Sequence, residues 1–289
     1  MLAGDDQTFH KWPAVPHAIP GYHVTITTNW HTHTFRCKHA SGDVEDYCRA
    51  ALTQGLTTLG FSDHTPLPDR RWNSVRMEME QLRDYTDAID EAREAFPDLR
   101  VVKGLECEYV PEFTGVYRDI FRGEYEMDYL AGGAHWYPYD GEWVGLYGPD
   151  MTPAMLAAYA DYIVECIASG LFAYIAHPDL FGNAYYVWDG EARACSRAIL
   201  SAAAAAGVPL EFNAYGLRKP LTDTPTGPRH GYPWLPFWEL AADYDVRVLV
   251  NSDAHRPQDV AGKVEEAADI VREFGLNIIL DPLVAADDA

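Results

Sequence analysis

Apolar residues recur along the chain in two alternating patterns, which are short runs rich in β-branched residues and longer amphipathic stretches. The short runs predict buried strands, and the longer stretches predict helices. Strands are expected at residues 24–30, 56–62, 99–106, 127–134, 171–176, 208–212 and 246–251, with a small last strand at 276–280. Helices are expected at residues 43–54, 77–96, 153–169, 191–206, 235–244 and 260–274. Regular alternation of strand and helix predicts a parallel sheet covered by helices.

Short polar residues and glycines mark several of the predicted helix ends. Asp43 and Thr152 stand where an N-cap side chain would accept a hydrogen bond from a free backbone amide. Gly55, Gly170 and Gly207 each follow a predicted helix, where a residue in the left-handed conformation commonly ends it. These residues support the helix boundaries that the apolar pattern indicates.

A histidine, a carboxylate or another polar residue stands at the end of each of the seven main strands. The segments are His31-Thr-His33, Asp63-His64, Glu106, His135, His177, Glu211-Phe-Asn213 and Asp253-Ala-His255. The carboxyl ends of strands in a parallel barrel meet at one mouth, where active sites lie. The competing architecture, an open doubly wound sheet, would gather ligands mainly at one switch point. We therefore expect an α/β fold, a distorted (β/α)7 TIM-like barrel.

The chain has no internal repeat or linker that would divide it. We expect a single domain over residues 1–289, with an N-terminal extension at 1–23 and the barrel at 24–280. Insertions are expected at 107–126, 136–152 and 214–233, each after a strand that carries polar residues, where a barrel places its functional loops.

Composition excludes several classes of function. The formal net charge is −22, from 44 acidic and 22 basic residues, which argues against a broad nucleic-acid surface and against adhesion to anionic lipid. No apolar run is long enough for a membrane span, and the N-terminus does not have the pattern of a signal peptide. The five cysteines include no Cys-x-x-Cys pair, so we expect reduced thiols in a cytoplasmic protein. Cys37 and Cys107 neighbour candidate ligands, and one of them could enter a metal shell.

The histidines at the strand ends predict a polynuclear metal site. His31 and His33 are two residues apart, so on a strand they point to the same side and could grip one ion. His39 follows in a short loop and could serve a neighbouring ion. Mixed nitrogen and oxygen ligands suit Zn²⁺, Mn²⁺ or Fe²⁺, and the sequence does not choose among them.

These motifs, in this order, resemble those of the polymerase and histidinol phosphatase (PHP) family of metal-dependent phosphoesterases. The stretch from Leu210 to Pro220, which contains Asn213, Arg218 and Lys219, resembles the histidinol-phosphatase branch, as does Tyr232-Pro233. The resemblance spans about residues 25–275 and implies a distorted seven-stranded barrel with three divalent metal ions.

The resemblance also assigns the ligands. The first ion would be held by His31, His33, Glu106 and Asp253, the second by Glu106, His135 and His177, and the third by His39, His64 and His255. Glu106 would bridge the first two ions, which a carboxylate can do and an imidazole cannot.

This ligand set predicts hydrolysis of a small phosphate monoester. Two neighbouring ions can share a water and lower its pKa, so that the resulting hydroxide attacks phosphorus. Asp253 would orient this water or take its proton, and Glu106 would hold the ions together. His230 or a metal-bound water would protonate the leaving group. Arg218, and more weakly Lys219, would bind the substrate phosphate.

One departure from the histidinol-phosphatase branch concerns the phosphate. That branch commonly supplies a second phosphate-binding arginine from the region that corresponds to residues 136–176, whereas this stretch contains no Lys or Arg. It is instead aromatic and acidic, which would suit a cationic or ring-bearing substrate.

Three other functions stay open. A cyclic phosphodiester or a nucleotide could be the substrate in the same fold. A non-catalytic barrel used as a scaffold is less favoured, because every ligand position is filled. An amidohydrolase or deaminase would also begin with His-x-His, but it usually has a bridging lysine where this chain has Glu106.

Overall fold

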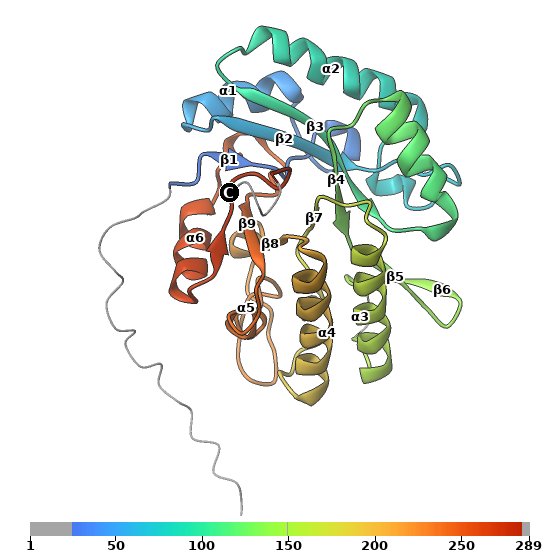
Figure 1. Cartoon of the computed structure of the whole chain (residues 1–289), viewed down its shortest axis with the longest axis vertical. Helices are drawn as coiled ribbons and strands as arrows, with labels where there is room; N and C mark the ends of the chain where they lie inside the picture. The colour runs from blue at the N-terminus through green and yellow to red at the C-terminus, as the bar shows by residue number, and fades with distance from the viewer. Residues whose placement is uncertain (1–24, 149, 285–289) are drawn as a thin grey trace, which may run out of the picture.

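The computed structural model of the protein describes residues 25–148 and 150–284 and consists of a curled parallel sheet with helices on its outer side (Figure 1). The predicted extension at 1–23 lies outside these residues, and the expected single domain stays a prediction. The sheet has the strand order β1-β2-β3-β4-β7-β8-β9-β10. Its strands are β1 (Thr28–Asn29), β2 (Thr58–His64), β3 (Arg100–Glu108), β4 (Tyr129–Gly133), β7 (Tyr174–Ile175), β8 (Leu210–Asn213), β9 (Arg247–Asn251) and β10 (Asn277–Ile278).

The first and last main strands meet and close the ring. Thr32 and Ala254 form a parallel bridge, in which the His33 amide donates to the Ala254 carbonyl at 2.9 Å. At the base, β10 pairs with β9, and the Leu280 carbonyl beyond it accepts from the Trp30 indole at 2.8 Å. The predicted distorted barrel with seven main strands and a small last strand is therefore confirmed.

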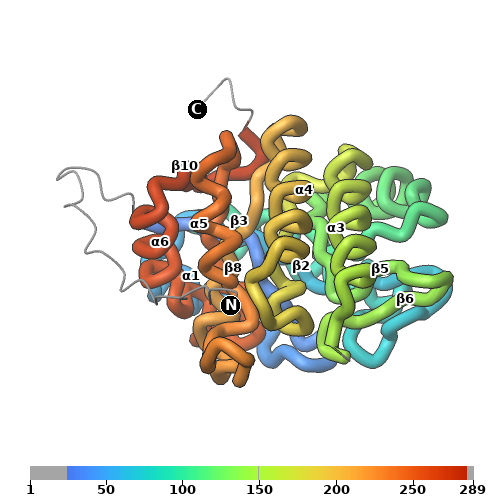
Figure 2. Tube along the Cα trace, turned by 90° about the horizontal axis from the view of Figure 1, so that it is seen from below, coloured from blue at the N-terminus to red at the C-terminus, as the bar shows by residue number. Residues whose placement is uncertain are grey.

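The six α-helices of the described residues lie on the outside of the barrel. Several of them lie side by side when the molecule is seen from below (Figure 2). The six helices are α1 (Val44–Thr53), α2 (Leu82–Ala95), α3 (Pro153–Ala168), α4 (Gly190–Ala206), α5 (Leu235–Ala241) and α6 (Val264–Glu273). Asp43 caps α1 through a reciprocal capping box with Asp46, and Thr152 accepts from the Met155 amide at the start of α3. None of the helices in the described ranges is long and apolar enough to cross a membrane.

Several elements are shorter than the apolar pattern predicts, and β1 and α2 show a physical reason. Only Thr28–Asn29 form β1, because the Trp30 amide donates to the Asn251 side chain at 2.8 Å rather than to a neighbouring strand. Helix α2 begins at Leu82 and not near Met77, because Met79–Gln81 form a separate 3₁₀ turn. Neither the side-chain contact at Trp30 nor the 3₁₀ turn before α2 alters the apolar periodicity, so the pattern does not report them.

A small apolar cluster fills the barrel below its mouth. It contains Trp30, Tyr129 and Tyr174, all fully buried. The two tyrosine hydroxyls donate to the Trp30 carbonyl at 2.7 and 2.8 Å. Gly104 admits the Tyr129 ring, since a Cβ there would lie 2.4 Å from it. The residues at the strand ends therefore rest on a packed and fully hydrogen-bonded floor.

The three expected insertions follow their strands. Residues 107–126 contain a π-helical segment, Val116–Glu124, and residues 136–152 contain the hairpin β5 (Trp136–Tyr139) and β6 (Glu142–Gly145). Residues 214–233 form an irregular loop that includes a 3₁₀ turn at Gly216–Arg218. The last two insertions bring aromatic side chains over the mouth of the barrel.

Candidate metal centre and active site

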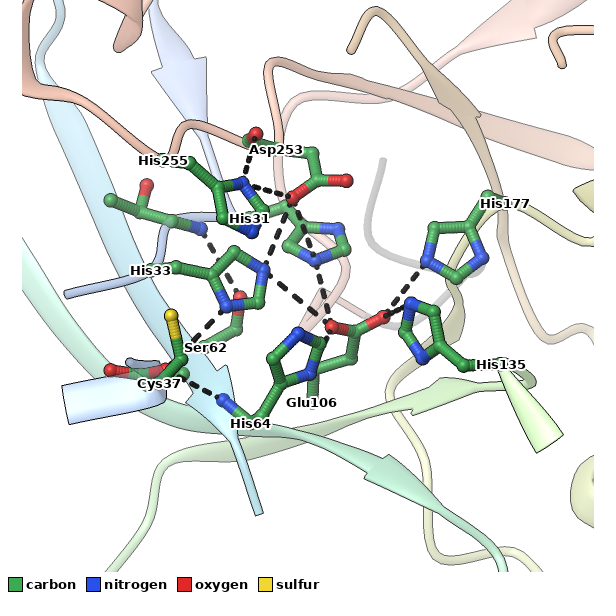
Figure 3. Close-up of polar contacts among 12 residues, drawn as sticks. His31, His33, Cys37, Ser62, His64, Glu106, His135, His177, Asp253 and His255 are labelled. Carbon is green, nitrogen blue, oxygen red and sulfur yellow. Dashed lines mark hydrogen bonds and ion pairs between the residues drawn. The ribbon is translucent and has the colours of Figure 1, made fainter. Parts of the chain in front are cut away.

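The strand ends bring eight of the predicted ligands into one cluster at the barrel mouth (Figure 3). They are His31 and His33 after β1, His64 at the end of β2, Glu106 in β3, His135 after β4, His177 after β7, and Asp253 and His255 after β9. Parallel pairing sets His64 opposite Glu106, so neighbouring strands deliver both to the same level. His39 joins the cluster from the loop that follows β1.

Glu106 lies at the centre of the cluster, with histidines facing both of its carboxylate oxygens. Its Oε2 lies 3.3 Å from His31 Nε2 and 3.5 Å from His33 Nε2. Its Oε1 lies 2.9 Å from His177 Nε2 and 3.7 Å from His135 Nε2. A carboxylate with a separate set of nitrogens on each oxygen can bridge two cations.

Asp253 faces the same histidines from the opposite edge of the ring. Its Oδ1 lies 3.1 Å from His33 Nε2 and 3.6 Å from His31 Nε2. The backbone φ is +48° at Asp253 and +30° at His177, a region that L-residues rarely adopt. Such strain is tolerated where the surrounding structure over-determines a residue, and it clusters at functional sites.

The remaining histidines form a group beside this centre. His39 Nε2 and His255 Nε2 lie 3.1 Å apart, and the His255 ring stacks on His33 with centroids 4.2 Å apart. His64 lies between this group and the centre, because its Nδ1 is 3.0 Å from Glu106 Oε2 while its ring centroid is 5.3 Å from that of His39. Cys37 also lies within ligand distance of His39 and His255, and all five cysteines are free and buried, as expected.

The cluster fits a bound metal because several of its buried polar atoms have no hydrogen-bond partner. These atoms include His31 Nε2, His33 Nε2, His64 Nδ1, Glu106 Oε2 and Asp253 Oδ1. A buried polar atom without a partner costs free energy. Divalent cations would satisfy these atoms together, since each is a nitrogen or oxygen donor aimed at the same space. The site is therefore a divalent-metal site.

Two carboxylates orient histidines without facing the centre, and neither role was predicted from the sequence. Glu211 lies 2.8 Å from His31 Nδ1 and also accepts from the Asn213 and Asn251 side chains. Glu108 lies 2.8 Å from His135 Nδ1. A carboxylate on one ring nitrogen fixes the tautomer and leaves the other nitrogen free as a ligand. A signal was present, since Glu108 is two residues after Glu106 and must share its face of the strand.

Without metal, the cluster divides into two groups by pKa. Burial lowers the pKa of His33, but the carboxylates of Asp253 and Asp63, which lie 3.1 and 3.6 Å from its ring nitrogens, outweigh burial and raise the pKa to about 9. The pKa values of His31 and His177 are raised, because nearby carboxylates outweigh their burial. The pKa values of His39, His64 and His255 are lowered by burial and by the charge on His33. The second group is thus neutral, which is the protonation state that binds metal.

A cavity of about 370 Å³ opens above the cluster. The two predicted substrate-binding residues, Arg218 and Lys219, differ in their position relative to this cavity. Lys219 lines this cavity, with its Nζ 4.7 Å from the centre of the Tyr215 ring and 4.9 Å from that of Tyr232. Arg218 does not line the cavity. Its guanidinium donates to the Gly262 and Ser252 carbonyls at 2.7 and 2.8 Å, so it fixes the loop that carries Asp253.

His230 is not brought to the cluster. It lines a second cavity with Arg229 and Trp234, whereas the cavity above the cluster is reached by Tyr232, two residues later. The assignment of His230 as general acid stays a prediction, and this placement does not support it.

A closed parallel barrel whose mouth holds a buried set of histidines and carboxylates defines a metal-dependent barrel enzyme. The family model for the PHP domain matches residues 29–215. The chain therefore belongs to the PHP family, as its motifs predicted.

Individual relatives extend this comparison. The chain is 34% identical to a probable histidinol-phosphatase of Deinococcus radiodurans over 259 residues, which cover 85% of this chain and 92% of that protein. It is 26% identical to the histidinol-phosphatase of Bacillus subtilis, over 80% and 94% of the two chains. A solved structure of the Lactococcus lactis histidinol phosphate phosphatase, complexed with zinc, L-histidinol and phosphate, has the same fold, with a TM-score of 0.69 at 14% identity over 88% and 95% of the chains.

Proposed function

We propose that this protein is a metal-dependent phosphatase that hydrolyses a small phosphate monoester, with histidinol phosphate as the nearest named substrate. The observation that carries the proposal is the position of Glu106, whose two oxygens face separate sets of histidines at the mouth of the barrel. The relatives named histidinol-phosphatase support the choice of substrate, since they match most of the chain.

We propose three ions, held as the resemblance implies. His31, His33, Glu106 and Asp253 would hold the first ion. Glu106, His135 and His177 would hold the second, and His39, His64 and His255 the third. Zinc is a candidate for all three, because the Lactococcus lactis relative contains it and because the donors are nitrogen and oxygen. The expected cytoplasmic location remains a prediction.

The chemistry follows from the residues around the cavity. When bound, divalent ions supply Lewis acidity, which polarises phosphoryl oxygens and makes water a stronger acid. Asp253 lines the cavity and its Oδ1 has no hydrogen-bond partner, so it is the carboxylate that would take the proton of the attacking water. Asn213 donates to the other oxygen, Oδ2, at 3.1 Å and thereby holds Oδ1 toward the cavity.

Lys219 is the residue that we propose binds the substrate phosphate. Its ammonium group is the one Lys or Arg charge among the residues that line the cavity, so a phosphate entering there meets this cation directly. The Lys219 side chain is partly buried, and this burial lowers its pKa. Charge pairing is stronger in such surroundings than in bulk water.

Lys219→Met is expected to raise KM for a phosphate monoester by about 10- to 100-fold, because a hydrogen bond to a charged group contributes about 1.5–3 kcal/mol. Steady-state kinetics at saturating metal measures this change. Lys263→Met is the matched control, since Lys263 pairs with Glu266 at the outer surface. Equal KM values in the two variants would refute the role of Lys219.

A cyclic phosphodiester is the second candidate substrate. It carries less charge than a monoester, and the cavity lining offers a single cation beside the aromatic Trp136, Tyr215 and Tyr232. This balance of charge and aromatic surface would suit a less charged, ring-bearing ester.

Phosphate release from a panel of esters tests the proposal on purified protein with measured metal content. The panel holds histidinol phosphate, other small monoesters, nucleotides and five-membered cyclic phosphates. Cyclic esters are opened to monoesters, which are then detected by coupled hydrolysis. The highest kcat/KM on histidinol phosphate is expected. Preference for a cyclic ester would replace the substrate and keep the reaction, whereas no hydrolysis by metal-loaded protein would overturn the proposed function.

A further inference from the structure

A fully buried arginine lies next to the cluster but belongs to none of its ligand sets. The Arg76 side chain has no exposed surface, and its Nη2 contacts Glu108 Oε2. Its Nε and Nη1 have no hydrogen-bond partner. Arg76 comes from the loop between β2 and α2, so a long connection delivers a single charge to the interior.

A buried ion pair of this kind is weak evidence for stability. Removing two charges from water costs free energy that their attraction often does not repay, and apolar replacements of such pairs are frequently neutral. The unpartnered nitrogens of Arg76 add to this cost. A role outside folding stability is therefore the better explanation for the pair.

The other oxygen of Glu108 holds a proposed metal ligand. Glu108 Oε1 lies 2.8 Å from His135 Nδ1, and His135 Nε2 lies 3.7 Å from Glu106 Oε1. With Nδ1 donating to Glu108, Nε2 of His135 has its lone pair directed at the cluster. The three residues form a line of contacts from Arg76 through Glu108 to His135.

Two tryptophans hold the arginine in place. The Arg76 guanidinium lies 5.3 Å from the Trp72 ring centre and 5.4 Å from that of Trp136. The two rings stack with centroids 4.7 Å apart and planes 17° apart. Cation–π contacts of this kind favour a desolvated guanidinium. Because Trp136 also lines the cavity, the pair joins the aromatic wall to His135.

Comparison with Glu211, the other carboxylate that orients a histidine, indicates why Glu108 has a cationic side chain as its partner. Glu211, which holds His31, accepts from the side chains of Asn213 and Asn251 inside the barrel. His135 lies nearer the rim, where its side chain is 12% exposed while that of His31 is fully buried. Glu108 has no asparagine donor among the hydrogen bonds that the described part of the chain forms, and Arg76 takes that place.

We propose that Arg76 and Glu108 are positioning residues for the metal site, which hold His135 in the tautomer and orientation that bind a divalent cation. The inference rests on the proposed role of His135 as a metal ligand. It predicts that the pair controls the retention of one ion, and through it turnover, without contacting the substrate.

The test uses the double variant Arg76→Met/Glu108→Gln, because single substitutions would leave a buried charge unpaired. Three quantities are measured: the melting temperature of the metal-free protein, the affinity for Co²⁺ from its visible absorption, and kcat and KM on the ester that the wild type prefers. Lys103→Met is the control. It breaks an ion pair with Asp90 at 2.6 Å from the same strand β3, but on the face turned to α2.

The double variant is expected to melt near the wild-type temperature without metal and to bind the most weakly held Co²⁺ about 10- to 100-fold less tightly. Its kcat should fall at limiting metal and recover partly in excess metal, with KM little changed. Lys103→Met should bind Co²⁺ as the wild type does. Because Co²⁺ binding is read without turnover, a wild type that binds Co²⁺ and hydrolyses no ester would refute the proposed function and leave this inference standing.

Two results would overturn the inference. One is wild-type Co²⁺ affinity in the double variant, which would show that His135 needs no such support. The other is loss of the metal-free fold in the double variant, which would assign the pair to stability alone.

Discussion

Glu106→Gln is expected to lower kcat by about 10³-fold or more, because removing the charge that we propose bridges two ions forfeits several kcal/mol of Lewis-acid stabilisation, at about 1.36 kcal/mol per factor of ten. Glutamine keeps the size of the side chain, but its amide nitrogen cannot coordinate a cation. One of the two sets of histidines that now face Oε1 and Oε2 would therefore lose its shared ligand. Phosphate release at matched protein concentration measures the loss, and metal analysis measures the ions that remain.

Glu112→Gln is the matched control for this variant, since Glu112 is an exposed glutamate on the loop after the same strand. It should keep wild-type activity and metal content. His33→Ala should resemble Glu106→Gln, because His33 faces both Glu106 and Asp253. Retained activity with bound metal in either variant would contradict the assignment of these residues.

Removal of the metal ions by a chelator is expected to abolish activity and to lower the melting temperature by roughly 10 °C. An ion present at 1,000 times its Kd stabilises by about 4 kcal/mol, and each kcal/mol shifts the melting temperature by about 2–4 °C in a chain of this size class. Differential scanning calorimetry with and without chelator, followed by addition of Zn²⁺, measures both the loss and its reversal. An unchanged melting temperature would show that the cluster does not retain metal.

The stability that the protein loses when metal is removed should depend on pH in a defined direction. The pKa of His33 is raised to about 9 in the metal-free fold, above its unfolded value of about 6.5. The stability that this histidine contributes is therefore complete below about pH 6.5 and is lost as the pH rises through 9. As the metal ligand that we propose, His33 would be neutral throughout this range. We expect the gap between bound and chelated protein to widen from pH 7 to pH 9, and a constant gap would contradict this account.

The sequence was sufficient to predict the ring of strands and the cluster of histidines. Both predictions depend on features that are close together in the sequence, because each ligand stands at the end of an apolar run. Parallel strands end at the same side of the sheet, so these ligands meet there. The PHP resemblance added the division into three sets. The start of α2 was predicted too early, near Met77, because a 3₁₀ turn at Met79–Gln81 leaves the apolar spacing almost unchanged.

The residues that support the ligands were harder to predict, because their contacts depend on distances through space. Arg218 was favoured over Lys219 for the substrate, yet the guanidinium of Arg218 donates to backbone carbonyls while Lys219 lines the cavity. Nothing in the sequence around Arg76 marks it, since its partner is 32 residues away on β3. Side chains that act on ligands rather than as ligands need coordinates to be found.

The bridge between Thr32 and Ala254 has a consequence for biosynthesis. It joins segments more than two hundred residues apart, and the proposed first ion takes ligands from both, so neither segment can complete that ion's cage alone. A nascent polypeptide still lacking its final portion would emerge from the ribosome unable to capture the cation. Acquisition of this ion would then report that synthesis has passed β9 and that the first and last main strands of the barrel have found each other.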